Sequence, residues 1–132
     1  MTLGVVGSRS LEELGNSTVI HEMEIIFDEF NITKVVSGGA KGPDRTSVRY
    51  AREKRMKYEE FIPDWDEYGK KAGFLRNKTI IENSDILLAF WDGFSKGTKN
   101  SIDLAKAKGI PYKIILISSN NELSEWDEPD IY

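Results

Sequence analysis

Short apolar runs alternate with longer segments of helical spacing from residue 3 to residue 117. The apolar runs have the length of β-strands, and they cover residues 3–6, 34–37, 58–62, 86–90 and 112–117. The helical segments lie between them, at residues 16–30, 43–55, 69–82 and 98–108. Strict alternation of this kind predicts a parallel sheet with helices on both faces. We therefore expect an α/β fold, a three-layer sandwich around a mainly parallel five-stranded sheet.

Residues at the ends of these segments support the boundaries. Asn16 or Ser17 can cap the start of a helix, and Pro43 suits a first helical turn. Gly109 follows the last helical segment, where a helix C-cap is expected. Residues 64–68 lie between a strand and a helix, and we expect them to form a loop.

A chain of 132 residues fits one domain, which we place at residues 1–118, followed by an acidic tail at residues 119–132. No apolar run approaches the ~20 residues that span a bilayer, and the N-terminal residues lack the pattern of a signal peptide. The chain has no cysteine, which excludes disulfides and thiolate zinc sites. We expect a cytoplasmic protein with no membrane partner.

The charge of the chain is concentrated at its end. The net charge of −4 argues against general nucleic-acid binding. Residues 121–132 contain no basic residue, and their acidic residues are Glu122, Glu125, Asp127, Glu128 and Asp130. We interpret this tail as a solvated end of the chain. Trp126 and Tyr132 leave open the alternative that the tail docks on a partner protein.

Three of the predicted strands are followed by loops with glycines. The residues of interest are Gly7, Ser8 and Arg9 after the first strand, Ser37, Gly38, Gly39, Ala40 and Lys41 after the second, and Asp92, Gly97 and Thr98 after the fourth. Parallel strands place their carboxyl ends at one edge of a sheet, where ligands bind. Glycine allows close backbone approach, and a helix N-terminus adds free N–H donors. The three loops together predict a phosphate-binding site, although each alone is compatible with a simple turn.

Charged side chains accompany these loops. Arg9 and Lys41 either contact phosphate oxygens or are solvated loop charges. Asp44 and Arg45 begin the second predicted helix. Asp44 either favours the helix dipole or binds a ribose hydroxyl.

The segment after the third strand carries further candidates. Trp65 and Tyr68 either stack on a nucleotide base or only cover the core. Arg76 and Asn77 lie within the next helical segment, and a surface salt bridge is the alternative to ligand binding for Arg76. We include all four residues in the predicted ligand site.

Several common chemistries are disfavoured by the sequence. It contains neither a GxxxxGK[ST] P-loop nor a GxGxxG fingerprint, which argues against Walker-type ATP hydrolysis and ordinary dinucleotide redox chemistry. His21 is the only histidine and lies within a helical segment, so histidine-based triads are excluded. No carboxylate cluster has metal-ligand spacing, and no cofactor is required. A Mg²⁺ ion carried by a phosphate ligand is compatible with the sequence.

Five segments resemble the YspA/YpsA-related branch of the SLOG superfamily. They are GVVGSR at 4–9, SGGAKGPDR at 37–45, PDWDEYG at 63–69, AGFLRN at 72–77 and SDILLAF at 84–90, and Gly97-Thr98 follows them. The resemblance covers residues 3 to 117 in the right order. It implies a Rossmann-like sheet and a ligand that is a nucleotide, a nucleotide derivative or a related phosphate compound. Relatives include DprA-like proteins, molybdenum-cofactor carriers and LOG phosphoribohydrolases, and they imply a homodimer or higher assembly.

The LOG comparison bears on catalysis. LOG enzymes cleave the base–ribose bond of nucleoside monophosphates with an Arg and with the Glu of a PGGxGTxxE segment. Arg76 is in the place of that Arg, but Ser101 is in the place of the Glu. Serine cannot supply the negative charge that supports a cation-like transition state. Asp103 is two residues further on, about 200° away around a helix, and is a poor substitute.

We therefore expect a nucleotide-binding protein that acts as a sensor or a sequestering protein in nucleotide signalling. A bulky residue at Gly39 is expected to abolish binding without unfolding the chain. The alternative is a LOG-like phosphoribohydrolase or another nucleotide hydrolase that uses Arg76, Asp44 or Asp92. A third alternative is an accessory protein recognised through its acidic tail.

Overall fold

A six-stranded sheet forms the centre of the protein. The structure, a computed structural model, describes residues 1–11, 16–118 and 123–125. The strands are β1 (Thr2–Gly7), β2 (Lys34–Ser37), β3 (Lys57–Glu60), β4 (Ile86–Trp91), β5 (Tyr112–Ile117) and β6 (Leu123–Glu125). Their order across the sheet is β3-β2-β1-β4-β5-β6, with β1 to β5 parallel and β6 antiparallel to β5. The fold is therefore α/β with a mixed, mostly parallel sheet.

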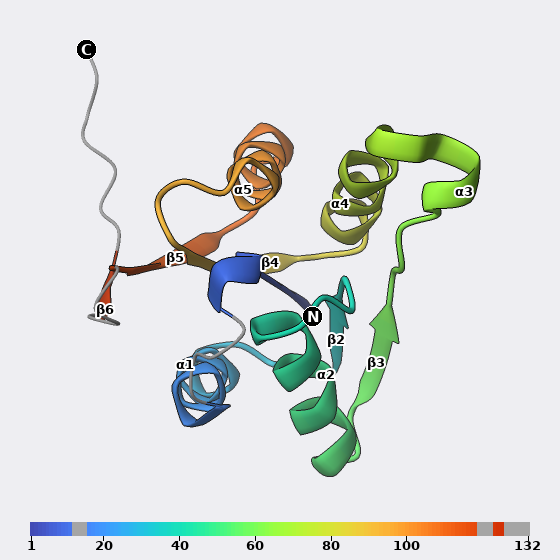
Figure 1. Ribbon diagram of the computed structural model, residues 1–132. Coiled ribbons are helices and arrows are strands. Elements are labelled where there is room, and N and C mark those ends of the chain that lie inside the picture. The colour runs from blue at the N-terminus through green and yellow to red at the C-terminus, as the bar shows by residue number, and fades with distance from the viewer. Residues whose placement is uncertain (12–15, 119–122, 126–132) are drawn as a thin grey trace.

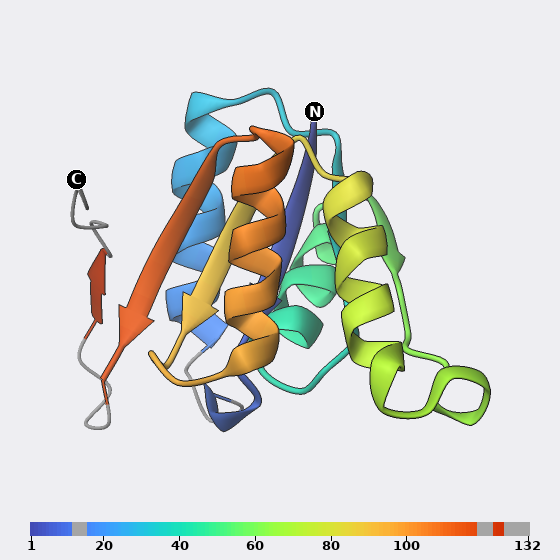
Figure 2. The same ribbon diagram turned by 90° about the horizontal axis from the view of Figure 1, so that it is seen from above.

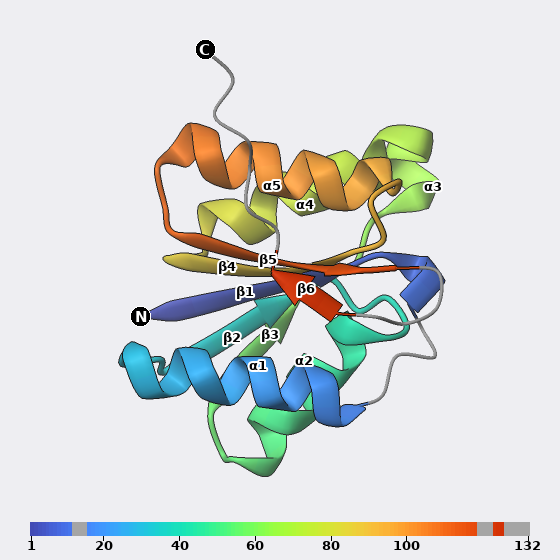
Figure 3. The ribbon, with the colours of Figure 1, turned by 90° about the vertical axis from the view of Figure 1, so that its left-hand side faces the viewer.

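Helices cover both faces of this sheet (Figures 1 and 3). The α-helices are α1 (Asn16–Glu29), α2 (Pro43–Glu53), α3 (Trp65–Tyr68), α4 (Ala72–Glu82) and α5 (Lys96–Lys108). The turns Arg9–Leu11 and Gly69–Lys71 are 3-10 helices, η1 and η2. Helices α1 and α2 pack on one face, and α4 and α5 pack on the other. No helix in the described part of the chain is long and apolar enough to cross a membrane.

The two faces have separate cores because successive residues of a strand point to opposite sides. Leu88 and Phe90 of β4 lie in the core under α1 and α2, whereas Leu87 and Ala89 lie in the core under α4 and α5. All four of these side chains are fully buried. The nearly unbroken apolar run of β4 thus reflects a strand covered on both sides.

The predicted order of elements is confirmed, with several corrections. Strand β3 ends at Glu60, two residues before the predicted end, and residues 69–71 form η2 before α4 begins. Residues 123–125 of the acidic tail form β6, so the sheet has a sixth strand, whereas Trp126 and Tyr132 lie outside the described residues. The expected loop at 64–68 contains the short helix α3, because the Asp64 side chain accepts the Glu67 amide at 3.1 Å and caps it. Helix α5 begins two residues before the predicted start, at Lys96.

The topology brings several loops to one edge. The five parallel strands run in the same direction, and Figure 2 shows α3 at the end where they finish. Strand β1 has β2 on one side and β4 on the other, so the strand order reverses there. A crevice is expected beyond the carboxyl ends of strands at such a point.

Candidate functional site

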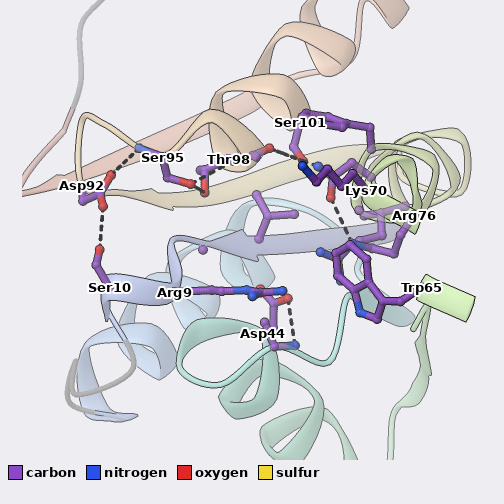
Figure 4. A pocket seen from close by; sticks show the side chains of 18 residues that line it. Arg9, Ser10, Asp44, Trp65, Lys70, Arg76, Asp92, Ser95, Thr98 and Ser101 are labelled. Atoms are coloured by element: carbon purple, nitrogen blue, oxygen red, sulfur yellow. Dashed lines mark hydrogen bonds between the residues drawn. The ribbon is translucent and has the colours of Figure 1, made fainter. Parts of the chain in front are cut away.

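A pocket of about 380 Å³ opens at this edge (Figure 4). It is lined by the turn after β1, the loop between β2 and α2, the first turns of α5, and residues of α3, η2 and α4. All of these segments are far apart in the sequence except the last three. The pocket is therefore a product of the topology, at the position where α/β sheets bind ligands.

The turn after β1 is held tightly between the two halves of the sheet. A Cβ on Gly7 would lie 2.5 Å from Cγ of Pro43, so only glycine fits against the start of α2. Ser8 is buried, and its hydroxyl lies 3.2 Å from the Thr98 hydroxyl in α5. The Asp92 amide donates to the same Ser8 oxygen at 3.3 Å. Ser8 is therefore a buried residue behind the pocket wall, and its hydrogen bonds connect the end of β1 to the loop after β4 and to α5.

Asp92 fixes the loop that leads into α5. Its carboxylate accepts the Phe94 and Ser95 amides at 2.8 Å each and the Ser10 hydroxyl at 2.6 Å. Burial alone would raise the pKa of Asp92, but the hydrogen bonds from Ser10, these two amides and Ser8 outweigh it and lower the pKa. Asp92 is therefore an ionised structural group, and its oxygens are engaged in holding the loop.

The N-terminus of α5 faces the pocket. Ser95 caps the helix, with its hydroxyl oxygen accepting the Thr98 amide at 3.4 Å. Ser95, Gly97, Thr98 and Ser101 line the pocket. A Cβ on Gly97 would meet no atom outside its own helix within 4 Å, so this turn is open. An open helix N-terminus offers N–H donors and a partial positive charge to an anion.

Asp44 lies at the start of α2 and is 4% exposed. Its Oδ2 accepts the Ala40 amide at 3.3 Å, whereas Oδ1 has no hydrogen-bond partner among the described residues. Burial raises the pKa of Asp44 to about 6, and the nearby Arg76 and the amides of Ala40, Gly7 and Gly38 only partly oppose this. The β2 loop thus directs amides toward a carboxylate of the protein itself.

Arg76 and Asn77 connect the loops from the side of α4. Nη1 of Arg76 donates to the Gly38 carbonyl at 2.8 Å, and Nε donates to Oδ1 of Asn77 at 3.0 Å. Nδ2 of Asn77 donates to the Gly97 carbonyl at 3.1 Å. Burial lowers the pKa of Arg76, Asp44 raises it and Arg9 lowers it further. This helix therefore positions the β2 loop and the first turn of α5 relative to each other.

An aromatic wall closes one side of the pocket. Trp65 is 48% exposed, and the guanidinium carbon of Arg9 lies 6.0 Å from the centre of its ring. A Cβ on Gly73 would lie 3.3 Å from the Trp65 ring. Phe74 also lines the pocket and is 51% exposed. Large exposed aromatic faces of this kind can stack on a base.

Most of the predicted site residues meet at this pocket. Those that line it are Gly7, Arg9, Ala40, Asp44, Trp65, Arg76, Asn77, Asp92, Gly97 and Thr98. Ser8, Ser37 and Gly38 are buried beneath it, where the Ser37 hydroxyl donates to the Val5 carbonyl at 2.6 Å.

Four predicted residues lie elsewhere. Lys41 and Arg45 line a separate pocket at the start of α2, and Tyr68 lines another pocket between the end of β3 and α4. Gly39 lines none of these pockets, and with φ at +75° its Cβ would overlap the Ile62 side chain. A bulky residue at Gly39 would strain the loop, so our proposed substitution there does not isolate ligand binding.

The structure adds residues that the sequence analysis missed. Ser10, Lys70, Phe74 and Ser95 all line the pocket. Ser95 stands three residues before Thr98, and the preference for serine at a helix N-cap was a usable signal. No sequence signal marked Lys70, because its position at the pocket depends on the path of α3 and η2.

Ser101, which the resemblance to LOG enzymes places at the position of their glutamate, lines the pocket and is not acidic. Ser101 is buried, and its hydroxyl donates to the Gly97 carbonyl at 3.4 Å. Asp103 forms an exposed ion pair with Lys99 at 2.5 Å and does not line the pocket. Within the part of the chain that the structure describes, no group of three or more histidine or acidic side chains could hold a metal ion.

Comparison with known proteins shows a similarity to a phage protein. No protein-family model matches the chain, and no solved structure matches it. The Gene 61 protein of Mycobacterium phage D29 is 40% identical over 83 residues. The match covers 58% of this chain and 66% of the phage protein, just under two thirds of its length. The name of the phage protein states no activity, so the similarity assigns no function.

Proposed function

We propose that this protein binds a nucleotide or a nucleotide-derived phosphate ligand in the pocket at the carboxyl edge of the sheet. The observation that carries the proposal is the convergence of the β1 turn, the β2 loop and the N-terminus of α5 on one pocket with an aromatic wall. The order β3-β2-β1-β4-β5 also supports a Rossmann-like fold, in which this edge is the nucleotide site.

The charges of the pocket favour an anionic ligand. Arg9, Lys70 and Arg76 line it, and the first turn of α5 adds N–H donors. Asp92 is negative, but its oxygens already accept hydrogen bonds from its own loop and Ser10. The phosphate therefore belongs at the α5 end of the pocket, and the base belongs against Trp65.

A pair of neighbouring lysines provides a controlled test. Lys70 lines the pocket, whereas Lys71 is also exposed and does not line it. Calorimetric titration with nucleoside mono-, di- and triphosphates, cyclic dinucleotides and ADP-ribose is expected to show binding by the wild type. Lys70→Ala removes one charge-assisted contact, so the affinity for the bound nucleotide is expected to fall roughly 3- to 10-fold. Lys71→Ala is the control and retains wild-type affinity. Absence of binding across the panel would refute the proposal.

A nucleotide hydrolase is the second candidate. It is favoured by Asp44, which lines the pocket and whose raised pKa is a feature of acid–base groups. Ser101 in the place of the LOG glutamate argues against LOG-type cleavage. Incubation with nucleoside monophosphates and chromatography for free base and ribose phosphate separates the two functions. Base release that is lost in Arg76→Ala would establish the hydrolase.

The wider setting of this function is also a proposal. The five sequence segments support membership of the SLOG superfamily and a role as a sensor or sequestering protein in the cytoplasm. A homodimer follows from the same resemblance, and light scattering after size-exclusion chromatography measures it directly. A Mg²⁺ ion, where present, would arrive on the phosphate of the ligand, since Asp92 has its oxygens engaged.

A further inference from the structure

The outer side of α2 carries basic side chains that do not line the nucleotide pocket. They are Lys41, Arg45, Arg49 and Arg52, all of them exposed, and we call them the basic face. The three arginines lie at helical spacing, so their side chains leave α2 on the same side. Lys41 belongs to the loop before the helix and lines a pocket of about 210 Å³ together with Arg45 and Arg49. In Figure 1, α1 and α2 form the layer below the sheet, and the side of α2 that faces away from the sheet is uncovered.

None of these side chains is neutralised by a described part of the chain. Basic residues elsewhere form ion pairs with carboxylates, as Lys34 does with Glu59 at 2.9 Å. No ion pair among the described residues involves a member of the basic face. The acidic residues of α2 itself are Asp44, which is buried, and Glu53, at the last position of the helix. The positive charge of the basic face is therefore available to an external anion.

This local charge contrasts with the charge of the whole chain. The chain has 18 basic and 22 acidic residues, and its net charge is −4. Such a sum argues against attraction of anions to every surface, but it does not describe a single face. Exposed charges further away than about 8 Å are largely screened at physiological ionic strength. A polyanion is therefore attracted to the basic face by the charges nearest to it, and acidic surfaces elsewhere orient the protein as it approaches.

We propose that the basic face binds the phosphate backbone of duplex DNA without reading its base sequence. Guanidinium groups bind phosphate oxygens in a bidentate geometry, and three of the four basic residues are arginines. Arg45 and Arg52 are separated by about 10 Å along the helix axis, at roughly 1.5 Å per residue. One strand of a duplex presents a phosphate about every 3.4 Å along its axis, so the arginines cover about three phosphates. Lys41 extends the row at the start of the helix.

Other anionic partners fit this face less well. Surfaces that bind single strands add aromatic side chains on which the bases stack. Within the described residues, no exposed aromatic side chain belongs to α2, and its Tyr50 stacks on Phe27 of α1 instead. A membrane surface binds helices through exposed apolar side chains, whereas Val48 and Ala51 of α2 are buried in the protein. A duplex exposes its phosphates and hides its bases, which suits a face that offers charge alone.

Fluorescence anisotropy with a labelled duplex tests the proposal on the full-length protein. Binding to a duplex of about 20 base pairs is expected at about 50 mM salt, with a slope of log K against log salt near −3.6, at roughly −0.9 for each of four contacts. Duplexes of unrelated sequence should bind with equal affinity, because phosphate contacts carry no sequence information. Absence of duplex binding at this salt concentration would overturn the inference. Equal or tighter binding of a single strand of the same length would also overturn it.

A double substitution separates the basic face from the overall charge. Arg45→Gln with Arg49→Gln removes two contacts and keeps residues that favour a helix. The salt slope should become shallower by about 1.8, and the affinity at about 50 mM salt should fall at least roughly 10-fold. Lys78→Gln with Lys99→Gln removes the same charge from exposed positions of α4 and α5, and this control should keep the wild-type slope. Equal losses in both variants would show that net charge alone governs binding, which contradicts the assignment to α2.

Two further titrations distinguish this inference from the other proposals. A synthetic peptide of residues 119–132 represents an acidic protein partner. Binding of this peptide that is lost in Arg45→Gln with Arg49→Gln, without any binding of duplex, would make the face a protein-docking surface and overturn the inference.

The nucleotide pocket is tested separately with the same variant. Neither Arg45 nor Arg49 lines that pocket, so nucleoside mono-, di- and triphosphates should bind the double variant with wild-type affinity. Failure of duplex binding alone would leave the proposed nucleotide function standing. Loss of nucleotide affinity in the folded double variant would show that the basic face belongs to the nucleotide site, which contradicts a separate role.

Discussion

Asp44 shows how a single residue connects stability to the candidate site. Asp44 lies in the first turn of α2, directly after Pro43. Its carboxylate interacts electrostatically with Arg76, which reaches the β2 loop from α4. The sequence indicated that Asp44 belongs to the site. Its burial was not predictable, because it depends on α4 covering the β2 loop from a position more than thirty residues away.

Ionisation of Asp44 opposes folding. Its pKa is about 6 in the folded protein and 3.8 in an unfolded chain, so the folded state binds more protons between these values. The stability that Asp44 contributes is therefore greatest below pH 4 and declines by about 3 kcal/mol as the pH rises to 7.

Urea unfolding of wild type and Asp44→Asn from pH 4 to pH 7 measures this contribution. The difference in the free energy of unfolding between the two proteins should move by most of that amount, about 2.4 kcal/mol, in favour of the variant as the pH rises from 4 to 7. Other carboxyl groups cancel in the difference. A difference that stays constant over this range would show that the carboxyl has an ordinary pKa.

At the scale of elements, the N-terminus of α5 is the feature with the clearest double role. Ser95 caps the helix, and the same turn lines the pocket. The Gly97-Thr98 sequence pointed to this turn, and the structure adds Ser95 and the support from Asp92 and Asn77. Helix capping and ligand binding can be separated by two substitutions at one position.

Ser95→Ala removes the cap and is expected to lower the free energy of unfolding by about 1 kcal/mol. Ser95→Asp restores an oxygen acceptor at the cap, and its negative charge favours the helix dipole, so stability should return to the wild-type level. The same charge repels an anion, and nucleotide affinity should fall at least roughly 10-fold. Thermal unfolding and calorimetric titration of both variants measure the two effects. Undiminished nucleotide binding by Ser95→Asp would place the phosphate elsewhere.

Over the whole molecule, the order of β and α segments through β5 was predictable, including the edge strand β3, and the other edge strand β6 was not. The apolar runs of β1, β4 and β5 follow from burial on both faces, and Gly109 caps α5 in the left-handed conformation as predicted. Strand β3 is exposed along its length, and β6 lies in an acidic segment without an apolar run. Neither edge strand carries the full alternation or burial from which strand pairing can be inferred.

The difference between central strands and peripheral segments also explains which site residues could be predicted from the sequence. Residues next to glycines at the ends of central strands were found from the sequence, because parallel strands fix where these ends lie. Lys41 and Arg45 follow the same strand end but point toward a separate pocket, since the loop turns at Gly42, where φ is +89°. Lys70 and Phe74 reach the pocket only through the path of α3 and η2.

The sixth strand gives a prediction for the molecule as a whole. Strand β6 pairs with β5 through residues 115–117 and covers what would otherwise be an open edge. Truncation after residue 118 should lower the melting temperature and cause concentration-dependent association, because an exposed edge strand pairs with other chains. Calorimetry and light scattering at several concentrations check this. An unchanged melting temperature and a concentration-independent mass would show that β6 does not stabilise the sheet, and the truncation would then also test the tail as a docking segment.

Residue-resolved NMR during a nucleotide titration tests the central claim most directly. Assigned amide spectra of the wild type are followed as a ribonucleoside monophosphate is added. We predict the largest shifts at Gly97 and Thr98, with smaller shifts at Arg9, Ala40 and the Trp65 indole. Shifts confined to the pocket around Lys41 and Arg45, or no shifts at millimolar nucleotide, would contradict binding at the carboxyl edge of β1 and β4.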